Sequence, residues 1–250
     1  MQSAELKTES AILYIPEFEQ PGIKHFFTTR EYSDHLSAPF VDRKTLVMVN
    51  QVHGDDIFII DKPVDGIASL LREASQSQCD ALITNQCDIG IGVVTADCLP
   101  VLIYDPVHSV IAAVHAGWKG TIKGILSKVI CRMVYKFKCL ADDIIVGMGP
   151  AIGACCYAVG ETVIEPFKST VPEWGKYLTP EEDGKAKLDL TALNIRQIED
   201  AGILTKNIFT MRLCTYCNRD LFFSYRRDGA GTGRMTSGIM MYGGKGFSRE

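Results

Sequence analysis

The sequence predicts a mixed α/β fold (α+β), in which packed mixed sheets are flanked by helices, in a single domain over residues 1–250. Three observations support this prediction. Short β-branched and aromatic runs bounded by turn residues recur along the chain. Other segments carry apolar residues at the three- and four-residue spacing of helices. A chain of 250 residues that is 46% hydrophobic can bury one substantial core.

Most of the expected strands lie in the first half of the chain. They cover residues 12–15, 24–29, 46–49 and 57–60, followed by 81–84, 89–95, 101–104 and 110–115. Pro100 is expected to delay the strand over 101–104. The joints between the last four strands are too short for helical crossovers, so we expect antiparallel or mixed pairing. Residues 31–45 are polar and predict a surface loop.

Three segments have the apolar spacing of helices. Residues 67–77 form the first, and residues 122–137 form the clearest, with cationic residues largely on its polar face. A third begins near residues 188–191, with Asp189 or Thr191 as candidate N-cap, and stops at Gly202. The remaining expected strands cover 144–148, 221–225 and 237–241, and residues 166–186 look like a variable polar excursion.

Composition restricts the partners and the compartment. The net charge of -4 provides no excess of cations to neutralise phosphates, so we expect a small-molecule partner and no nucleic acid. Nine cysteines without a disulfide pattern predict reduced thiols and a cytoplasmic protein. The N-terminus has no secretory signal, and the longest uncharged span, 144–160, is interrupted by glycine and proline, so no membrane is expected. The oligomeric state is not determined by the sequence, and a monomer is the default expectation.

Three potential metal ligands lie at the ends of expected strands: His53, Cys98 and His115. Strand ends at one edge of a sheet converge, so these side chains could share a site. One thiolate and two imidazoles suit Zn²⁺, and three protein ligands leave the fourth position open, as in catalytic zinc sites. Cys98 could instead be a nucleophile with His115 as base and Asp97 as the orienting acid, or an inert core thiol.

The strings around these residues are distinctive, and together they resemble the YfiH (laccase-domain, formerly polyphenol oxidase) family. The resemblance runs from about residue 28 to residue 241. It rests on residues 50–54 (NQVHG), 95–100 (TADCLP), 113–120 (AVHAGWKG), 149–153 (GPAIG), 155–157 (CCY), 214–217 (CTYC) and 222–228 (FFSYRRD).

The resemblance implies a YfiH-like fold and a zinc site at His53, Cys98 and His115. It also implies phosphorolysis of adenosine, inosine, guanosine or S-methyl-5'-thioadenosine, and deamination of adenosine. Copper is the less favoured metal. The alternatives are a copper-dependent polyphenol oxidase, a cysteine-type amidase acting on peptidoglycan precursors, and a non-catalytic binding module. Five histidines in the whole chain are too few for a multicopper centre.

The implied chemistry needs a proton shuttle and a phosphate site. Asp97 beside Cys98 is favoured over Asp55 as the shuttle, and Cys98, His53 and His115 are the other expected catalytic residues. The candidates for binding substrate or phosphate are Arg226, Arg30, Gln51 and Arg234.

Other motif residues receive less specific interpretations. The pair Cys214 and Cys217 needs two more ligands to bind a structural zinc, and the adjacent Cys155 and Cys156 are an awkward second half. All four are therefore interpreted as structural or redox-accessible. Trp118 is expected to pack, and Lys119 to be a solvated residue at the start of the helix.

Overall fold

The computed structural model describes residues 2–3, 7–9, 11–32 and 46–243, so the predicted loop at 31–45 lies almost wholly outside the described residues. Its largest sheet has seven strands and mixed pairing, as predicted for the central strands. In spatial order they are β1 (Gln2–Ser3), β15 (Ile208–Thr210), β11 (Ile145–Met148), β9 (Leu99–Asp105), β10 (Val110–Ala116), β7 (Ala81–Thr84) and β6 (Ile57–Ile60).

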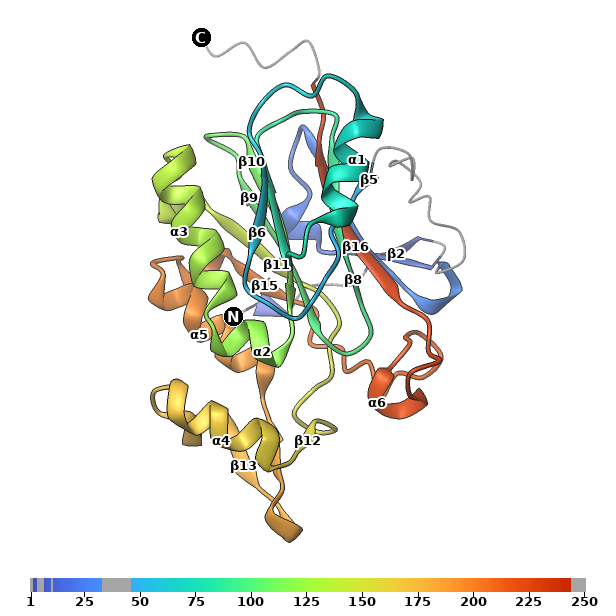
Figure 1. Ribbon diagram of the computed structural model, residues 1–250, viewed down its shortest axis with the longest axis vertical. Helices are drawn as coiled ribbons and strands as arrows, with labels where there is room; N and C mark the ends of the chain where they lie inside the picture. The colour runs from blue at the N-terminus through green and yellow to red at the C-terminus, as the bar shows by residue number, and fades with distance from the viewer. Residues whose placement is uncertain (1, 4–6, 10, 33–45, 244–250) are drawn as a thin grey trace.

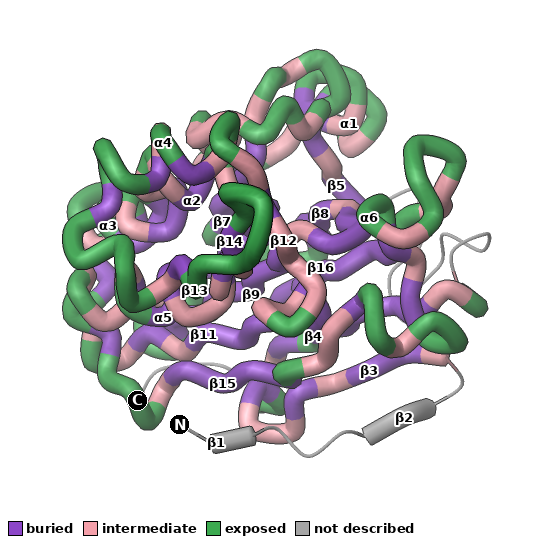
Figure 2. The backbone as a smooth tube through the Cα atoms, turned by 90° about the horizontal axis from the view of Figure 1, so that it is seen from below, coloured by how far each residue is buried: buried purple, intermediate pink, exposed green. Residues whose placement is uncertain are grey.

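A six-stranded sheet packs against one face of the larger sheet. Its order is β2 (Lys7–Glu9), β3 (Ile12–Tyr14), β4 (Ile23–Thr28), β16 (Met235–Met241), β8 (Gly90–Thr95) and β5 (Leu46–Val47). The core between the sheets includes Phe27, Ile91 and Ile239 from the smaller sheet and Leu82 and Leu102 from the larger one, all at most 1% exposed. Alternating apolar residues in both sheets therefore share one interior (Figure 2).

Two helices cover the other face of the seven-stranded sheet, α3 (Ile125–Phe137) and α5 (Leu190–Asp200) (Figure 1). Leu126, Val129, Ile130 and Met133 place a continuous apolar stripe of α3 on β10 and β7. Asp189 is the N-cap of α5, because its carboxylate accepts a hydrogen bond from the backbone N–H of Ala192. Helix α1 (Ile67–Gln76) packs near β5.

The polar segment of residues 166–186, expected to be a variable excursion, carries regular secondary structure. With the residues on either side of it, it forms α4 (Glu161–Thr170) and a small antiparallel sheet of β12 (Ala158–Val159), β14 (Ala186–Leu188) and β13 (Leu178–Pro180). Val159, Phe167, Leu178 and Leu188 build a separate small core there. These apolar residues are too widely spaced for the sequence pattern to reveal them.

Three local predictions differ from the structure. Pro100 does not delay a strand, because β9 begins at Leu99 and Pro100 pairs with His115. The helix expected over 122–137 is present as α3 but begins only at Ile125, because Gly124, with a φ of +75°, separates it from the short helix α2 (Trp118–Ile122). Residues 221–225 form no strand; they lead into α6 (Tyr225–Asp228).

Short 3-10 turns connect several elements. They are η1 (Pro16–Phe18), η2 (Arg30–Tyr32), η3 (Ala141–Asp143), η4 (Trp174–Lys176), η5 (Glu182–Gly184) and η6 (Thr205–Asn207). No helix among the described residues is long and apolar enough to cross a membrane.

Candidate metal centre

Cys98 lies where the chain passes from one sheet to the other. Strand β8 belongs to the six-stranded sheet and β9 to the seven-stranded sheet, and residues 96–98 join them. Asp97 makes this turn with a φ of +91°, an uncommon conformation for a residue other than glycine. The Cys98 side chain is thereby held between two rigid sheets and is partly buried.

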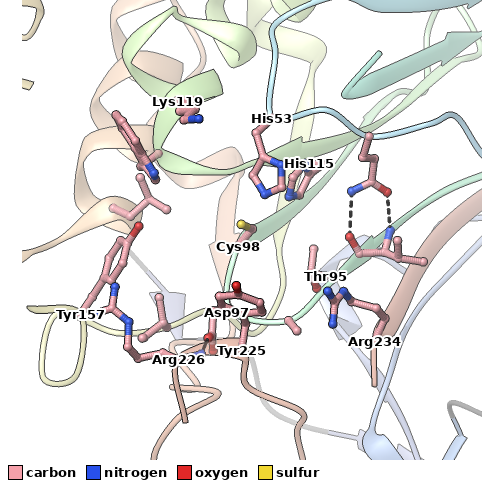
Figure 3. Close-up of a pocket in the computed structure, with 16 residues that line it drawn as sticks. His53, Thr95, Asp97, Cys98, His115, Lys119, Tyr157, Tyr225, Arg226 and Arg234 are labelled. Atoms are coloured by element: carbon pink, nitrogen blue, oxygen red, sulfur yellow. Dashed lines mark hydrogen bonds between the residues drawn. The ribbon is translucent and has the colours of Figure 1, made fainter. Parts of the chain in front are cut away.

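The structure brings together the three ligands predicted from the sequence. The ligand atoms of His53, Cys98 and His115 all lie within 4.8 Å of one another, so they could hold one metal ion. His115 stands near the end of β10, and His53 lies in the loop between β5 and β6 with a φ of +60°. Their rings meet edge to face with centroids 4.8 Å apart (Figure 3).

A fourth residue, Asp80, positions both histidines. Its carboxylate accepts a hydrogen bond from His115 Nδ1 at 2.6 Å and from the backbone N–H of His53 at 2.9 Å. It also accepts hydrogen bonds from the backbone N–H groups of Val52 and Gly54. Because His115 uses Nδ1 to bond Asp80, its Nε2 is left for the metal. This is the usual arrangement of a carboxylate behind a ligating histidine. The sequence interpretation missed Asp80, although a carboxylate directly before a wholly buried strand was a signal.

These contacts shift the protonation of the site. Burial would raise the pKa of the Cys98 thiol, but its hydrogen bonds and charge interactions with His115 and His53 lower that pKa to about 6. Burial would lower the pKa of His115, but Asp80 and Cys98 raise it to about 9. Burial likewise opposes ionisation of Asp80, whose hydrogen bonds from His115 and Gly54 nevertheless keep its pKa below the ordinary value. The thiolate that a metal ligand requires is therefore favoured near neutral pH.

The backbone leaves room for an ion at this point. A Cβ at Gly117 would lie 3.2 Å from both Cys98 Sγ and His53 Cδ2, and 3.8 Å from His115 Cε1. Glycine at residue 117 therefore leaves the space beside all three ligands free.

The candidate metal centre opens into a cavity of about 570 Å³. Its lining residues come from both sheets, α2, the small core and α6. They are Gln51, His53, Val94, Thr95, Ala96, Asp97, Cys98, His115, Trp118, Lys119, Ile152, Tyr157, Leu190, Tyr225, Arg226 and Arg234. The volume lies within the range of small-molecule sites.

Asp97 lines this cavity but its carboxylate is engaged with the protein. It accepts hydrogen bonds from Thr215 Oγ1 at 2.6 Å, Ser224 Oγ at 3.0 Å and the backbone N–H of Arg226 at 2.6 Å. These bonds attach the loops around residues 215 and 225 to the turn that carries Cys98. Asp55 is not among the lining residues and pairs with Lys123 and Lys128.

The predicted substrate residues are divided between the cavity and its surroundings. Arg226 and Arg234 line the cavity and lie on either side of Asp97 in Figure 3. Gln51 also lines it, but both ends of its amide bond the backbone of Val94 at 2.8 Å. Arg30 is not among the lining residues; its guanidinium bonds the carbonyl of Arg219 and stacks on a phenylalanine ring.

Several lining residues carry functional groups that the sequence interpretation left unassigned. Lys119, expected to be solvated, faces the cavity from α2 with its ammonium 5.7 Å from the Trp118 ring centroid. Tyr157 stacks with the Arg226 guanidinium at 5.3 Å. Thr95 is 2% exposed, and its hydroxyl has no hydrogen-bond partner among the described residues. Such an orphaned hydroxyl is costly unless a ligand or water pairs with it.

Comparison with known proteins is consistent with this geometry. The family model described as "multi-copper polyphenol oxidoreductase laccase" matches residues 29–242, which is most of the chain. The protein belongs to this laccase-domain family. A laccase-domain relative from Clostridium acetobutylicum, named purine nucleoside phosphorylase, is 36% identical over 239 residues and covers 94% of each chain.

A second relative, from an unknown prokaryotic organism, is named adenosine deaminase RL5. It is 35% identical over 200 residues, which are 80% of this chain and 76% of that protein. Among solved structures, the hypothetical protein YfiH of Bacillus licheniformis superposes with a TM-score of 0.84 at 29% identity. The match covers 94% of this chain and 98% of that one. The mixed α/β, single-domain YfiH-like fold predicted from the sequence is confirmed.

Proposed function

We propose that this laccase-domain protein is a zinc-dependent purine nucleoside phosphorylase that also deaminates adenosine. Its substrates would be adenosine, inosine, guanosine or S-methyl-5'-thioadenosine, with inorganic phosphate as the second substrate. The observation that carries the proposal is the convergence of His53, Cys98 and His115 on one point of an open cavity. The names of the two relatives, a phosphorylase and a deaminase, support the two reactions.

Zinc is the metal that this donor set favours. A thiolate and two imidazoles are borderline ligands that suit tetrahedral zinc, and the open fourth position is typical of catalytic sites. Two imidazoles and one thiolate also occur in blue-copper sites, but those usually add a weak axial methionine, and no methionine lines the described cavity. Five histidines in the chain could not build a trinuclear copper cluster as well. When bound, zinc would supply a Lewis acid for the reacting group.

The side chains around the metal centre provide the remaining functions. The rings of Trp118, Tyr157 and Tyr225 give the cavity flat surfaces against which a purine could stack. The orphaned Thr95 hydroxyl could bond a polar edge of the nucleoside. Arg226 and Arg234 bring guanidinium groups suited to bidentate binding of phosphate.

Both proposed reactions also need a group that transfers protons. Asp97 is the candidate that the sequence favours, and it lies beside Cys98. Its three hydrogen bonds to Thr215, Ser224 and Arg226 instead favour a positioning role, in which Asp97 holds the Cys98 turn and the Arg226 backbone in place.

The test of the proposal measures zinc content and nucleoside turnover in wild-type protein and Cys98→Ala. We expect the wild type to release free base from nucleosides only when phosphate is present, and Cys98→Ala to lose the zinc of this site together with both activities. Cys131→Ala is the matched control, because Cys131 is exposed on α3, outside the cavity. Full activity in Cys98→Ala would refute the proposal.

One observation favours a second candidate, a cysteine-type amidase. Cys98, His115 and Asp80 form a contiguous series of thiol, imidazole and carboxylate. The orienting acid in such a site would be Asp80 and not Asp97, which the sequence suggested. This candidate requires activity in metal-free protein and its loss when Cys98 is alkylated. The phosphorylase proposal requires the opposite result: metal-free protein should be inactive, and added zinc should restore its activity.

Arg226 provides a prediction that separates the two proposed reactions. Arg226→Ala should reduce phosphorolysis on the order of a hundredfold, since a charged hydrogen bond to phosphate is lost. Deamination of adenosine, which uses no phosphate, should change much less. The measurement is kcat/KM for both reactions, with Arg196→Ala as control because Arg196 pairs with Asp200 on the surface of α5. Equal losses in both reactions would remove Arg226 from the phosphate site.

A further inference from the structure

We propose that the protein holds a second, structural metal ion in a closed site of four cysteines, Cys155, Cys156, Cys214 and Cys217. Two motifs that are about sixty residues apart in the sequence meet here. All four sulfur atoms lie within 4.8 Å of one another. The sequence interpretation considered the adjacent pair an awkward second half for a site with the Cys-x-x-Cys pair, and the structure brings the two pairs together.

The spacing of the sulfur atoms fits tetrahedral coordination. With Zn–S bonds of about 2.3 Å, two sulfurs on a tetrahedron are separated by about 3.8 Å. Cys155 Sγ lies 3.7 Å and Cys156 Sγ 3.3 Å from Cys217 Sγ. None of the four cysteines forms a disulfide. A set of four thiolates with no open position is the donor set of structural zinc sites.

The local backbone is shaped around the sulfurs. The N–H of Gly153 donates a hydrogen bond to Cys214 Sγ at 3.3 Å, an interaction that favours the thiolate a metal requires. A Cβ at Gly153 would lie 3.2 Å from Cys155 Sγ and 3.6 Å from Cys214 Sγ, so a side chain there would crowd the cluster. The adjacent cysteines can both face the cluster because the chain turns at this point, with the N–H of Cys156 bonded to the Gly153 carbonyl.

The Arg227 guanidinium holds the carbonyl groups of the Cys-x-x-Cys turn in place. Arg227 donates hydrogen bonds at 2.9 Å to the carbonyls of Thr215 and Tyr216, which lie between Cys214 and Cys217. A backbone bridge joins Ala151 to Cys214. The turn is therefore already positioned for coordination, and little conformational entropy is lost when a metal binds.

A metal ion here would join two loops that lie next to residues lining the cavity. Tyr157 follows Cys156 directly, and Thr215 bonds the Asp97 carboxylate. The loop of residues 153–157 otherwise contacts the 214–217 turn through few bonds, the Gly153 N–H among them. Cys155 and Cys217 are exposed to solvent, so burial of apolar side chains does not hold them together. A bound ion would supply the stabilisation that a hydrophobic core supplies elsewhere.

The experiment counts metal per chain in variants of each candidate site, in full-length protein purified under reducing conditions and equilibrated with zinc. We expect about two zinc ions in the wild type and about one in Cys98→Ala, Cys217→Ser and Cys156→Ser. The double variant Cys98→Ala/Cys217→Ser should hold none. Cys131→Ser is the matched control and should keep both ions, since it removes an exposed thiol outside the cluster.

Cobalt substitution of Cys98→Ala tests the ligand set without altering any of the four cysteines. Co²⁺ in that protein should show the intense thiolate-to-cobalt charge-transfer bands and tetrahedral ligand-field bands of a tetrathiolate site. The proposal is overturned if these bands are absent, or if the two cysteine variants of the cluster keep the zinc content of the wild type. A disulfide in the purified protein, detected as two missing thiols on titration of the denatured chain, would also overturn it.

The zinc counts also separate failure of the four-cysteine site from failure of the proposed function. If the His53, Cys98 and His115 site binds no zinc, wild type and Cys98→Ala will hold the same single ion, and the tetrathiolate site stands. If only the first site is real, Cys98→Ala will be metal-free.

Discussion

At the scale of single residues, the candidate metal centre depends on Asp80 as much as on its ligands. One buried carboxylate fixes the His115 ring and accepts the N–H of His53, whose backbone has a positive φ. A neutral residue at 80 would hold both histidines less firmly. Carboxylates in this position also raise the basicity of the ligand that they contact.

Asp80→Asn should therefore lower zinc affinity by about 10- to 100-fold, because the amide holds the His115 ring less firmly and carries no charge. Competition with a chelator of known affinity measures the loss. The control is Asp105→Asn, a second fully buried carboxylate that accepts N–H groups of Val107 and His108 far from the cavity. Equal zinc affinity in Asp80→Asn and wild type would show that Asp80 supports only the fold.

At the scale of elements, the site is built where β8, β10 and α2 meet. His115 is the second-last residue of β10, and the chain turns at Gly117 directly into α2, which contributes Trp118 and Lys119 to the cavity. Gly117 has a φ of -76°, which any residue can adopt, so glycine is required here by space and not by backbone conformation.

Gly117→Ala provides a steric test of this junction. The new Cβ would lie 3.2 Å from Cys98 Sγ and His53 Cδ2, so the ligands must shift by a few tenths of an ångström. We expect zinc affinity to fall on the order of tenfold with little loss of thermal stability. Gly160→Ala is the control, because Gly160 is also an extended N-cap glycine and a Cβ there meets nothing within 4 Å. An unchanged metal affinity in Gly117→Ala would contradict the geometry.

The sequence predicted elements better than it predicted contacts between them. The strands ending at Ile60, Thr84 and Met241 and the helix from residue 67 were found, because β-branched runs and apolar spacing are local signals. The motifs also led to His53, Cys98 and His115, whose side chains the structure brings together. Asp80 was missed, and the combination of Cys155 and Cys156 with Cys214 and Cys217 was set aside, since both depend on tertiary packing that spacing does not encode.

At the scale of the whole molecule, stability should decline as the solution is acidified. His25 on β4 is 2% exposed, accepts the N–H of Ile15 through Nε2, and lies against the rings of Tyr14, Phe18 and Phe27. Burial lowers its pKa from 6.5 to about 4. The unfolded chain therefore binds a proton on His25 at a higher pH than the folded chain does.

This difference contributes stability that is present above pH 6.5 and is lost as the pH falls toward 4. Between pH 7 and pH 5 the contribution of His25 to the free energy of unfolding should fall by about 2 kcal/mol. His25→Gln removes the titrating group and keeps a hydrogen-bond acceptor. Urea unfolding at the two pH values should show a smaller pH dependence in this variant than in wild type. The same pH dependence in both proteins would show that other groups dominate.

The strand order also determines when the metal centre can form during synthesis. Cys98 follows β8, and in its sheet β8 lies between β5 and β16, the last strand of the described chain. Residues 46–116 are synthesised well before residues 235–241. A nascent chain therefore contains His53, Cys98 and His115 while β8 can pair only with β5 and still lacks β16. Metal loading is therefore expected only after β16 has been synthesised and paired with β8, and chains truncated before Met235 should not acquire the ion.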